Sequence, residues 1–244
     1  RDYDLLLLPG ERARRRQAAA GHLTPGNHAV VGYPKIDRVF RGELPRDKAV
    51  ADLGLDPSRP TVLYAPTWRD AKRNTSLPKF GAEVMLASPR DYNLIVKLHP
   101  NTKNYDRKSY ALAEQAAARP NVKLFGYEHD VIPIMAAADL MIGDISAVTH
   151  EFLAFGRPYV FLNPWRLPIG KKKPWIWRCG KVVEKRGRVW PAVAEALAHP
   201  EAYAAERRGA LTEVFHQPDG HAAERAAEAI RSFLATRRNE EWRR

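Results

Sequence analysis

The fold of this chain is decided by residues 140–163, LMIGDISAVTHEFLAFGRPYVFLN. They indicate a buried strand, a polar turn at 143–146, a short helix, a glycine that ends the helix, and a second strand at 159–162. A strand that leads into a helix through Gly-Asp-x-Ser presents backbone N–H groups and a hydroxyl where the helix begins. Many α/β proteins bind phosphate at such a place, so the pattern favours an α/β fold and makes a phosphate-bearing ligand one interpretation of the turn.

Glu151 lies in the helix predicted at 147–155, beside an apolar stripe expected from Val148, Phe152 and Phe155. A carboxylate that borders a buried surface needs a hydrogen-bonding partner, which the hydroxyl groups of a ribose would provide. The simpler interpretation is an ordinary strand–helix–strand crossover with a glutamate at the surface. From this segment alone both interpretations stay open.

Short apolar runs alternate with helical patterns along most of the sequence. Many runs are continuously apolar, as in a parallel sheet that helices cover on both faces. We therefore expect an α/β fold with a doubly wound, Rossmann-like parallel sheet and a ligand crevice at the carboxyl ends of the strands. The predicted strands are 5–8, 29–32, 61–65, 92–98, 122–125, 140–142, 159–162 and 182–183. The predicted helices are 46–53, 79–87, 105–119, 131–137, 147–155, 192–198, 201–214 and 222–236.

The order of these patterns predicts three parts. Residues 1–44 carry two strands and one helix, too little for a domain, and we expect them to be the end of a truncated N-terminal domain. Residues 45–220 are expected to form a nucleotide-binding Rossmann-like domain. Residues 221–244 are expected to form a C-terminal helix that packs back toward the N-terminal part.

The composition favours an anionic partner. The 40 Lys and Arg residues outnumber the 28 Asp and Glu, which gives a formal net charge of +12. Such an excess suits nucleic acid, phospholipid headgroups or a phosphate-rich substrate, although solvation of helix ends also explains it. Cys179 is the only cysteine, which excludes an internal disulfide framework and favours a reducing compartment. No apolar run approaches the roughly 20 residues of a membrane span.

Two further strand ends carry polar residues. In LYAPTWR at 63–69, the Thr67 hydroxyl and the forked guanidinium of Arg69 suit an anion. In KLHP at 97–100, the proline ends the strand and the period of two places Lys97 and His99 on the same side. A doubly wound fold would bring both strand ends to the Gly-Asp-x-Ser turn. A plain polar loop and a structural histidine are the simpler interpretations.

Motifs for metals and common nucleotide loops are absent from the sequence. It contains no G-x-x-x-x-G-K-[ST], no G-x-G-x-x-G, no H-E-x-x-H and no zinc-like spacing of Cys and His, so we expect no metal and no cofactor. Residues 163–188 interleave three tryptophans with lysines and arginines. This segment suits a loop packed on the core, a membrane surface or anionic acceptor, or single-stranded nucleic acid. Nucleic acid is the least favoured because the basic residues follow no recognition motif.

The chain resembles the C-terminal part of the CDP-glycerol glycerophosphotransferase family, the teichoic-acid and capsule polymerases. The resemblance lies in GYPKID at 32–37, LYAPTWR at 63–69, KLHP at 97–100 and DLMIGDISAVTHEFLAFGRPYVFL at 139–162, in the family's order and at about its spacing. It implies the GT-B arrangement, in which two Rossmann-like domains face each other and the C-terminal one binds the nucleotide.

The resemblance also implies an enzyme that transfers glycerol phosphate, or a related polyol phosphate, from a CDP-activated donor to an acceptor hydroxyl in cell-envelope or capsule polymer synthesis. His99 would be the catalytic histidine. The candidate substrate-binding residues are Thr67, Arg69, Lys97, Asp144, Ser146, Ala147 and Glu151. The family commonly has Ser-Ser where this chain has Ser146-Ala147, and it often has Asp in place of Glu151.

The expected partners are CDP-glycerol or a related nucleotide donor, and a polyol-phosphate or glycan acceptor with or without a lipid link. We expect a cytoplasmic location at the inner face of the cell membrane, with the anionic membrane surface as a further partner. One alternative, which Glu151 favours, is a GT-B glycosyltransferase or epimerase that uses a UDP-sugar. The other is a non-catalytic fragment that binds a nucleotide or anion, because a second family histidine belongs to an N-terminal segment that this chain does not contain.

Overall fold

The computed structural model describes residues 3–68, 75–126, 128–167 and 173–241. The chain divides into two compact units, Arg1–Glu43 with Gly209–Arg244, and Leu44–Arg208. The first division lies beside the expected boundary at 44/45. The second lies at 208/209, whereas the sequence suggested 220/221.

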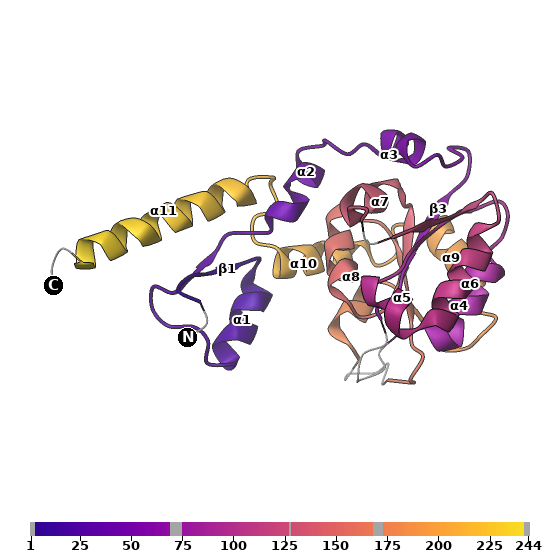
Figure 1. Cartoon of the computed structure of the whole chain (residues 1–244), viewed down its shortest axis with the longest axis horizontal. Coiled ribbons are helices and arrows are strands. Elements are labelled where there is room, and N and C mark those ends of the chain that lie inside the picture. Colours follow the sequence, from indigo (N-terminus) through magenta and orange to yellow (C-terminus); the bar gives the residue numbers. More distant parts are fainter. Residues whose placement is uncertain (1–2, 69–74, 127, 168–172, 242–244) are drawn as a thin grey trace. The chain divides into compact units, whose positions relative to one another are not determined.

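The first unit combines both ends of the chain (Figure 1). Its strands pair in parallel, and the C-terminal helix is tied to residues near position 37, because the carboxylate of Asp37 accepts hydrogen bonds from the amides of Ala222 (3.1 Å) and Ala223 (2.8 Å). Its elements are β1 (Leu6–Leu8), α1 (Glu11–Ala19), β2 (His28–Val30), η1 (Pro34–Ile36), α2 (Asp37–Phe40) and α11 (Ala222–Glu241), while α10 (Ala204–Val214) crosses the division.

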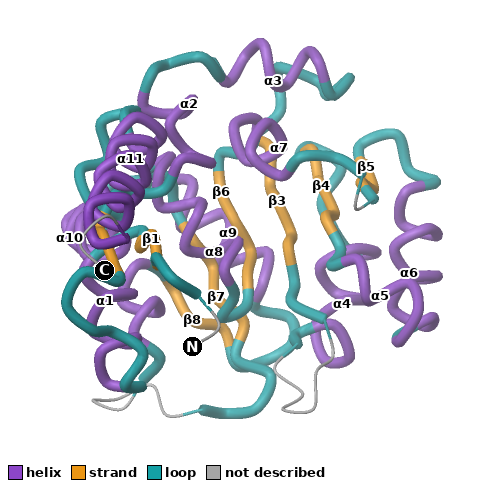
Figure 2. Tube along the Cα trace, turned by 60° about the vertical axis from the view of Figure 1, so that its left-hand side comes forward, coloured by secondary structure: helices purple, strands orange, loops and turns teal. Residues whose placement is uncertain are grey.

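The second unit is built on a six-stranded, all-parallel sheet, which Figure 2 shows nearly in full. The strands are β3 (Thr61–Ala65), β4 (Asn93–Lys97), β5 (Val122–Phe125), β6 (Leu140–Gly143), β7 (Tyr159–Leu162) and β8 (Lys181–Val183). Their order is β5-β4-β3-β6-β7-β8. The predicted fold class is thereby confirmed, since this is the strand order of a doubly wound Rossmann-like sheet.

Helices cover both faces of the sheet. The helices of this unit are α3 (Arg46–Asp52), α4 (Leu77–Leu86), α5 (Pro100–Tyr105), α6 (Arg107–Ala117), α7 (Val131–Ala137), α8 (Ala147–Glu151), η2 (Phe152–Phe155), η3 (Trp175–Cys179) and α9 (Val189–Ala198). Val62 and Tyr64 belong to one apolar cluster with α4, α6 and α9, while Leu63 between them is equally buried on the other face. Because successive side chains of a strand point to opposite faces, a strand covered on both sides is continuously apolar, as the sequence indicated.

The helix after β6 differs from its predicted form. It is α-helical only to Glu151 and then tightens into the 3-10 turn η2. Phe152 is fully buried, as expected, while Val148 and Phe155 are only partly buried, so the predicted stripe reaches the core only in part at these two positions. The tighter turn changes the angular spacing of the side chains and brings Leu153 into the core instead.

An ion pair between Arg46 and Asp139 connects helix α3 to the amino end of the sheet. Arg46 of α3 donates two hydrogen bonds to the Asp139 carboxylate, at 2.5 and 2.6 Å, and Asp139 also accepts the amide of Thr61 at 2.8 Å. Both charged side chains are three-quarters buried. The pair therefore joins α3 to the beginnings of β3 and β6.

We expect Arg46→Ala to lower the free energy of unfolding of residues 44–208 by about 2 kcal/mol, because it leaves a partly buried carboxylate without its charged donor. The matched control is Lys48→Ala on the same helix, which breaks an exposed pair with Asp52 and should cost about 0.5 kcal/mol or less. Urea denaturation followed by tryptophan fluorescence measures both. Equal losses in the two variants would contradict the anchoring role.

Candidate functional site

The candidate site lies at the carboxyl ends of β3 and β6, the two central strands of the sheet (Figure 2). The connections after β3 lead to β4 and β5 on one side, and those after β6 lead to β7 and β8 on the other. Ala65 at the end of β3 pairs with Gly143 at the end of β6, so the two following loops leave the sheet side by side. Doubly wound proteins bind ligands at this switch point.

Asp144 links these two loops. Its Oδ2 accepts hydrogen bonds from the backbone amides of Thr67 and Ser76, both at 3.0 Å, while only 1% of the residue is exposed. Its Oδ1 is buried and has no hydrogen-bond partner among the described residues. Burial raises the pKa of this carboxyl group from 3.8 to about 7, against the opposing effect of the hydrogen bonds. One side chain thus fixes both ends of the segment that connects β3 to α4.

Ser76, one of the two residues whose amides Asp144 accepts, also forms a side-chain hydrogen bond with Tyr64. The hydroxyl groups of Tyr64 and Ser76 lie 2.8 Å apart, and both residues are fully buried. Burial and the nearby Asp144 raise the pKa of the Tyr64 phenol well above its ordinary value. Tyr64 therefore serves as a neutral hydrogen-bonding group in this network.

Ser146 caps the helix that follows the turn. Its Oγ accepts the amide of Thr149 at 3.4 Å, and the Thr149 hydroxyl donates to the carbonyl oxygen of Asp144 at 2.7 Å. Ser146 is partly exposed, and Ala147 is exposed. The turn is therefore internally braced, yet its hydroxyl and the beginning of the helix stay accessible to a ligand.

Glu151 is 5% exposed at the end of α8. The interpretation of a surface glutamate is therefore wrong, because the chain turns inward after the helix and buries this side chain with Phe152. A ribose contact for Glu151 stays a prediction.

His99 stands at the end of β4 and caps α5. Its Nδ1 accepts the amide of Asn101 at 3.1 Å, and its ring stacks on Trp68, with 5.8 Å between ring centroids and 24° between planes. Since Nδ1 is an acceptor, the neutral ring must carry its proton on Nε2. Burial, and secondarily the charge of Lys97, lower the pKa of His99 below 6.5. Near pH 7 the ring is a neutral Nε2–H donor.

Lys97 contacts the loop after β5, and its predicted role in substrate binding stays a prediction. Its Nζ donates to the carbonyl oxygen of Gly126 in the loop after β5, and it acts on His99 through its charge. Arg69, the other predicted cation of the site, lies outside the described residues. The structure thus brings Thr67, Asp144 and Ser146 to the switch point, with His99 on the neighbouring strand.

Aromatic side chains to which the sequence analysis gave no role in this site lie around this set. Trp68 packs between His99 and Tyr105, whose ring centroid is 5.9 Å away. His150 donates from Nδ1 to the carbonyl oxygen of Ser146 at 2.9 Å and stacks on Trp175 at 5.8 Å. The only sequence signal for these contacts was the helical spacing of four between Ser146 and His150 and the aromatic beside Thr67.

The segment at 163–188 contributes to the core where it is described. Trp177 is 2% exposed, and the Arg178 guanidinium lies 4.6 Å from the ring centroid of Trp175. Trp165, by contrast, is 47% exposed. Trp177 thus packs in the core as the core interpretation predicts, while Trp175 is only partly buried and lies against His150 and Arg178.

The described part of the chain lacks two features, a metal-binding cluster and a membrane-spanning helix. It contains no group of three or more His, Cys, Asp or Glu side chains arranged to hold a metal ion. Within the same residues, no helix combines the length and apolar character that a bilayer crossing requires.

Comparison with known proteins gives a consistent result. The teichoic acid glycerol-phosphate primase of Bacillus subtilis (strain 168) is 29% identical over 160 residues, which are 65% of this chain and 39% of the primase. The teichoic acid poly(glycerol phosphate) polymerase of Bacillus spizizenii (strain ATCC 23059 / NRRL B-14472 / W23) is 28% identical over 148 residues, which are 54% of this chain and 34% of the polymerase. The chain thus spans well under half the length of these relatives.

The solved structures agree with this result at the level of the fold. A variant of the wall teichoic acid polymerase TagF, soaked with CDPG, superposes with a TM-score of 0.66 at 18% identity and covers 96% of this chain and 57% of the TagF chain. The sequence model of the CDP-glycerol:poly(glycerophosphate) glycerophosphotransferase family matches residues 1–232 of this chain. The resemblance found in the sequence motifs is therefore confirmed, and the chain belongs to the CDP-glycerol:poly(glycerophosphate) glycerophosphotransferase family.

Proposed function

We propose that this chain binds CDP-glycerol and supports transfer of its glycerol phosphate to a hydroxyl group of a growing poly(glycerol phosphate) acceptor in cell-wall polymer synthesis. Membership of the family supports the reaction class. The observation that carries the assignment of the site is the pair of backbone amides, of Thr67 and Ser76, that Asp144 holds across the switch point beside Ser146.

The reaction is an in-line substitution at phosphorus. The acceptor oxygen forms a bond to the β-phosphorus of the donor as the bond from that phosphorus to the bridging oxygen breaks, and CMP leaves with the bridging electron pair. The proton of the acceptor hydroxyl passes to a base or to solvent. Positioning and stabilisation of charge on the phosphates supply most of the catalysis in such reactions.

In this proposal His99 donates its Nε2–H to the diphosphate and stabilises the charge that develops on departing CMP. Its Nδ1 is occupied by the Asn101 amide, which suits a donor and disfavours a base at Nε2. Ser146 and the amide of Ala147 bind a donor phosphate, together with the Thr67 loop and its Arg69. Glu151 is kept as the ribose contact.

Asp144 has a different role in this proposal from the one that the sequence suggested. Its buried carboxyl group is directed at two backbone amides, so it is a positioning residue that shapes the donor site. The acceptor is proposed to be lipid-linked and the protein to act at the inner face of the cell membrane, which the net charge of +12 supports through attraction to anionic headgroups.

Ser146→Ala tests the donor site by calorimetric titration with CDP-glycerol. We expect affinity to fall about tenfold, because one hydrogen bond to a charged phosphate is lost. The matched control is Ser58→Ala. Ser58 is an exposed serine in the turn before β3, at the amino end of the sheet, away from the candidate site. Because Ser146 also caps α8, thermal unfolding must show that the variant is folded at the titration temperature.

Titration with UDP-N-acetylglucosamine completes this test. Tighter binding of the uridine ligand than of CDP-glycerol would replace the proposal with a UDP-sugar enzyme. An unchanged affinity for CDP-glycerol in Ser146→Ala would remove Ser146 from the site.

A further inference from the structure

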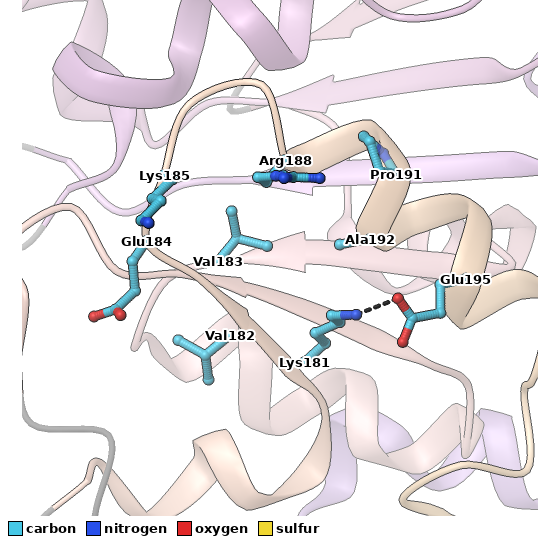
Figure 3. Close-up of a pocket in the computed structure, with 9 residues that line it drawn as sticks. All are labelled: Lys181, Val182, Val183, Glu184, Lys185, Arg188, Pro191, Ala192 and Glu195. Atoms are coloured by element: carbon cyan, nitrogen blue, oxygen red, sulfur yellow. Dashed lines mark hydrogen bonds and ion pairs between the residues drawn. The ribbon is translucent and has the colours of Figure 1, made fainter.

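A hollow of the unit Leu44–Arg208 lies apart from the switch point, along the edge strand β8. It has a volume of about 390 Å³ and lies between β8 and the helix α9. Figure 3 shows Val183 and Ala192 in its middle, the ion pair of Lys181 with Glu195 at one end, and Lys185 with Arg188 at the other. We call this hollow the β8 groove.

The two ends of the β8 groove differ in net charge. Lys181 is neutralised by Glu195, and Glu184 points away toward Asn163, whose side-chain amide donates to it at 2.8 Å. Lys185 and Arg188 are exposed, and no described carboxylate pairs with either. One end of the groove is therefore neutral, while the other carries Lys185 and Arg188 against the single carboxylate of Glu184, a net positive charge.

The charged end of the groove lies at the carboxyl end of the sheet, where the candidate site also lies. All six strands are parallel, so Lys185 beyond the end of β8 and Ser146 beyond the end of β6 leave the sheet in the same direction. Gly143 pairs with Phe161, and Phe161 pairs with Val182, which leaves one strand between β6 and β8. Two strand spacings amount to roughly 10 Å.

We propose that the β8 groove binds the acceptor, a chain of polyol units joined by phosphodiesters, and that Lys185 and Arg188 pair with its phosphates. The inference rests on the proposed function and deepens it by assigning the acceptor a surface on this unit. A slender chain with aliphatic carbons and one charge in each repeat fits an apolar floor with separate cations at its end. A few repeats span the distance to the Ser146 turn.

The lining disfavours other polyanions. Proteins that hold single-stranded nucleic acid stack its bases on aromatic side chains, and none of the residues that line the groove is aromatic. A membrane surface is bound by amphipathic or aromatic residues that project from the protein, whereas this groove is concave.

The test is binding of fluorescently labelled poly(glycerol phosphate) to the chain, measured by anisotropy over a range of salt concentrations. In the double variant Lys185→Gln with Arg188→Gln we expect the affinity to fall about tenfold and the salt dependence to become shallower, since two phosphate contacts are lost. CDP-glycerol affinity should be unchanged. The matched control is Arg90→Gln with Lys123→Gln, which removes the same charge near the start of β4 and from β5.

The outcomes separate this inference from the proposed function. If the unaltered chain does not bind CDP-glycerol, the proposed function fails, whatever the polymer does. If CDP-glycerol binds and the groove variant holds the polymer as tightly as the control variant does, the groove assignment is overturned. It is also overturned if phosphatidylglycerol vesicles or a single-stranded oligonucleotide bind more tightly than the polymer and depend on the same two cations.

Discussion

His99→Ala is expected to lower the rate of glycerol phosphate transfer by about 10²–10⁴-fold, the usual contribution of a positioned proton-donating group. The affinity for CDP-glycerol should change far less, because the hydrogen bond from Nε2 strengthens only as charge develops on the leaving phosphate. Release of CMP measured by coupled assay gives the rate, and calorimetry gives the affinity. His199→Ala, an exposed histidine after α9, is the control.

His99→Gln distinguishes the two possible roles of this histidine, a hydrogen-bond donor to the leaving phosphate and a general base. A glutamine amide can donate a hydrogen bond from a position close to Nε2 but cannot accept a proton near pH 7. We therefore expect partial recovery of the rate relative to alanine. A glutamine variant as slow as the alanine variant would contradict the donor role and favour a base.

The pH dependence follows from the lowered pKa of His99. The folded-state pKa lies below 6.5, so the neutral ring persists to more acidic pH than in an unfolded chain. Activity that depends on His99 should be level from pH 8 to below 6.5 and then decline, because protonation at Nδ1 breaks the hydrogen bond from Asn101. A decline already complete above pH 6.5 would contradict this assignment.

Asp144→Ala is expected to lower the free energy of unfolding of residues 44–208 by about 2–6 kcal/mol. It leaves the amides of Thr67 and Ser76 without their acceptor, and each buried group without a partner costs about 1–3 kcal/mol. Donor binding should fall with it, because the segment that those amides anchor loses its fixed ends. Urea denaturation and calorimetry with CDP-glycerol measure the two effects.

Asp144→Asn keeps an oxygen acceptor and removes the charge. The folded-state pKa of about 7 is above the ordinary value of 3.8, so the unfolded chain releases this proton first as pH rises. In the unaltered chain the free energy of unfolding should therefore decrease between pH 4 and 7 by up to about 4 kcal/mol from this group alone. The asparagine variant should lack that contribution, so its stability should decline less over this range. Parallel profiles for the two chains would show that the carboxyl group does not titrate there.

Much of the fold follows from local patterns. The strand at 61–65 is continuously apolar because both of its faces are covered, and this signal needs no knowledge of distant residues. Alternation of strands and helices then leads to a doubly wound sheet, whose switch point gathers the polar residues at the strand ends. In this way the sequence alone predicts Thr67, Asp144 and Ser146 as residues of one site.

The finer arrangement of the site depends on contacts between distant parts of the chain. Nothing near Asp144 in the sequence indicates that it accepts the amide of Ser76, because the two meet only when β3 and β6 pair. The stacking of His150 on Trp175 likewise requires the segment after β7 to return over α8. Helix α5 was missed because Pro100 was interpreted as the end of a strand, whereas a proline is equally suited to the first position of a helix.

The two outer strands of the sheet bear on whether copies of this protein aggregate through their sheet edges. Strands β5 and β8 end the sheet on either side, and both are short. Each also carries a lysine, Lys123 on β5 and Lys181 on β8. Short edges that carry charge resist the addition of a strand from another molecule, which is how open sheets escape aggregation. The same lysine-bearing edge strand that lines the groove thus helps to keep neighbouring molecules from joining their sheets.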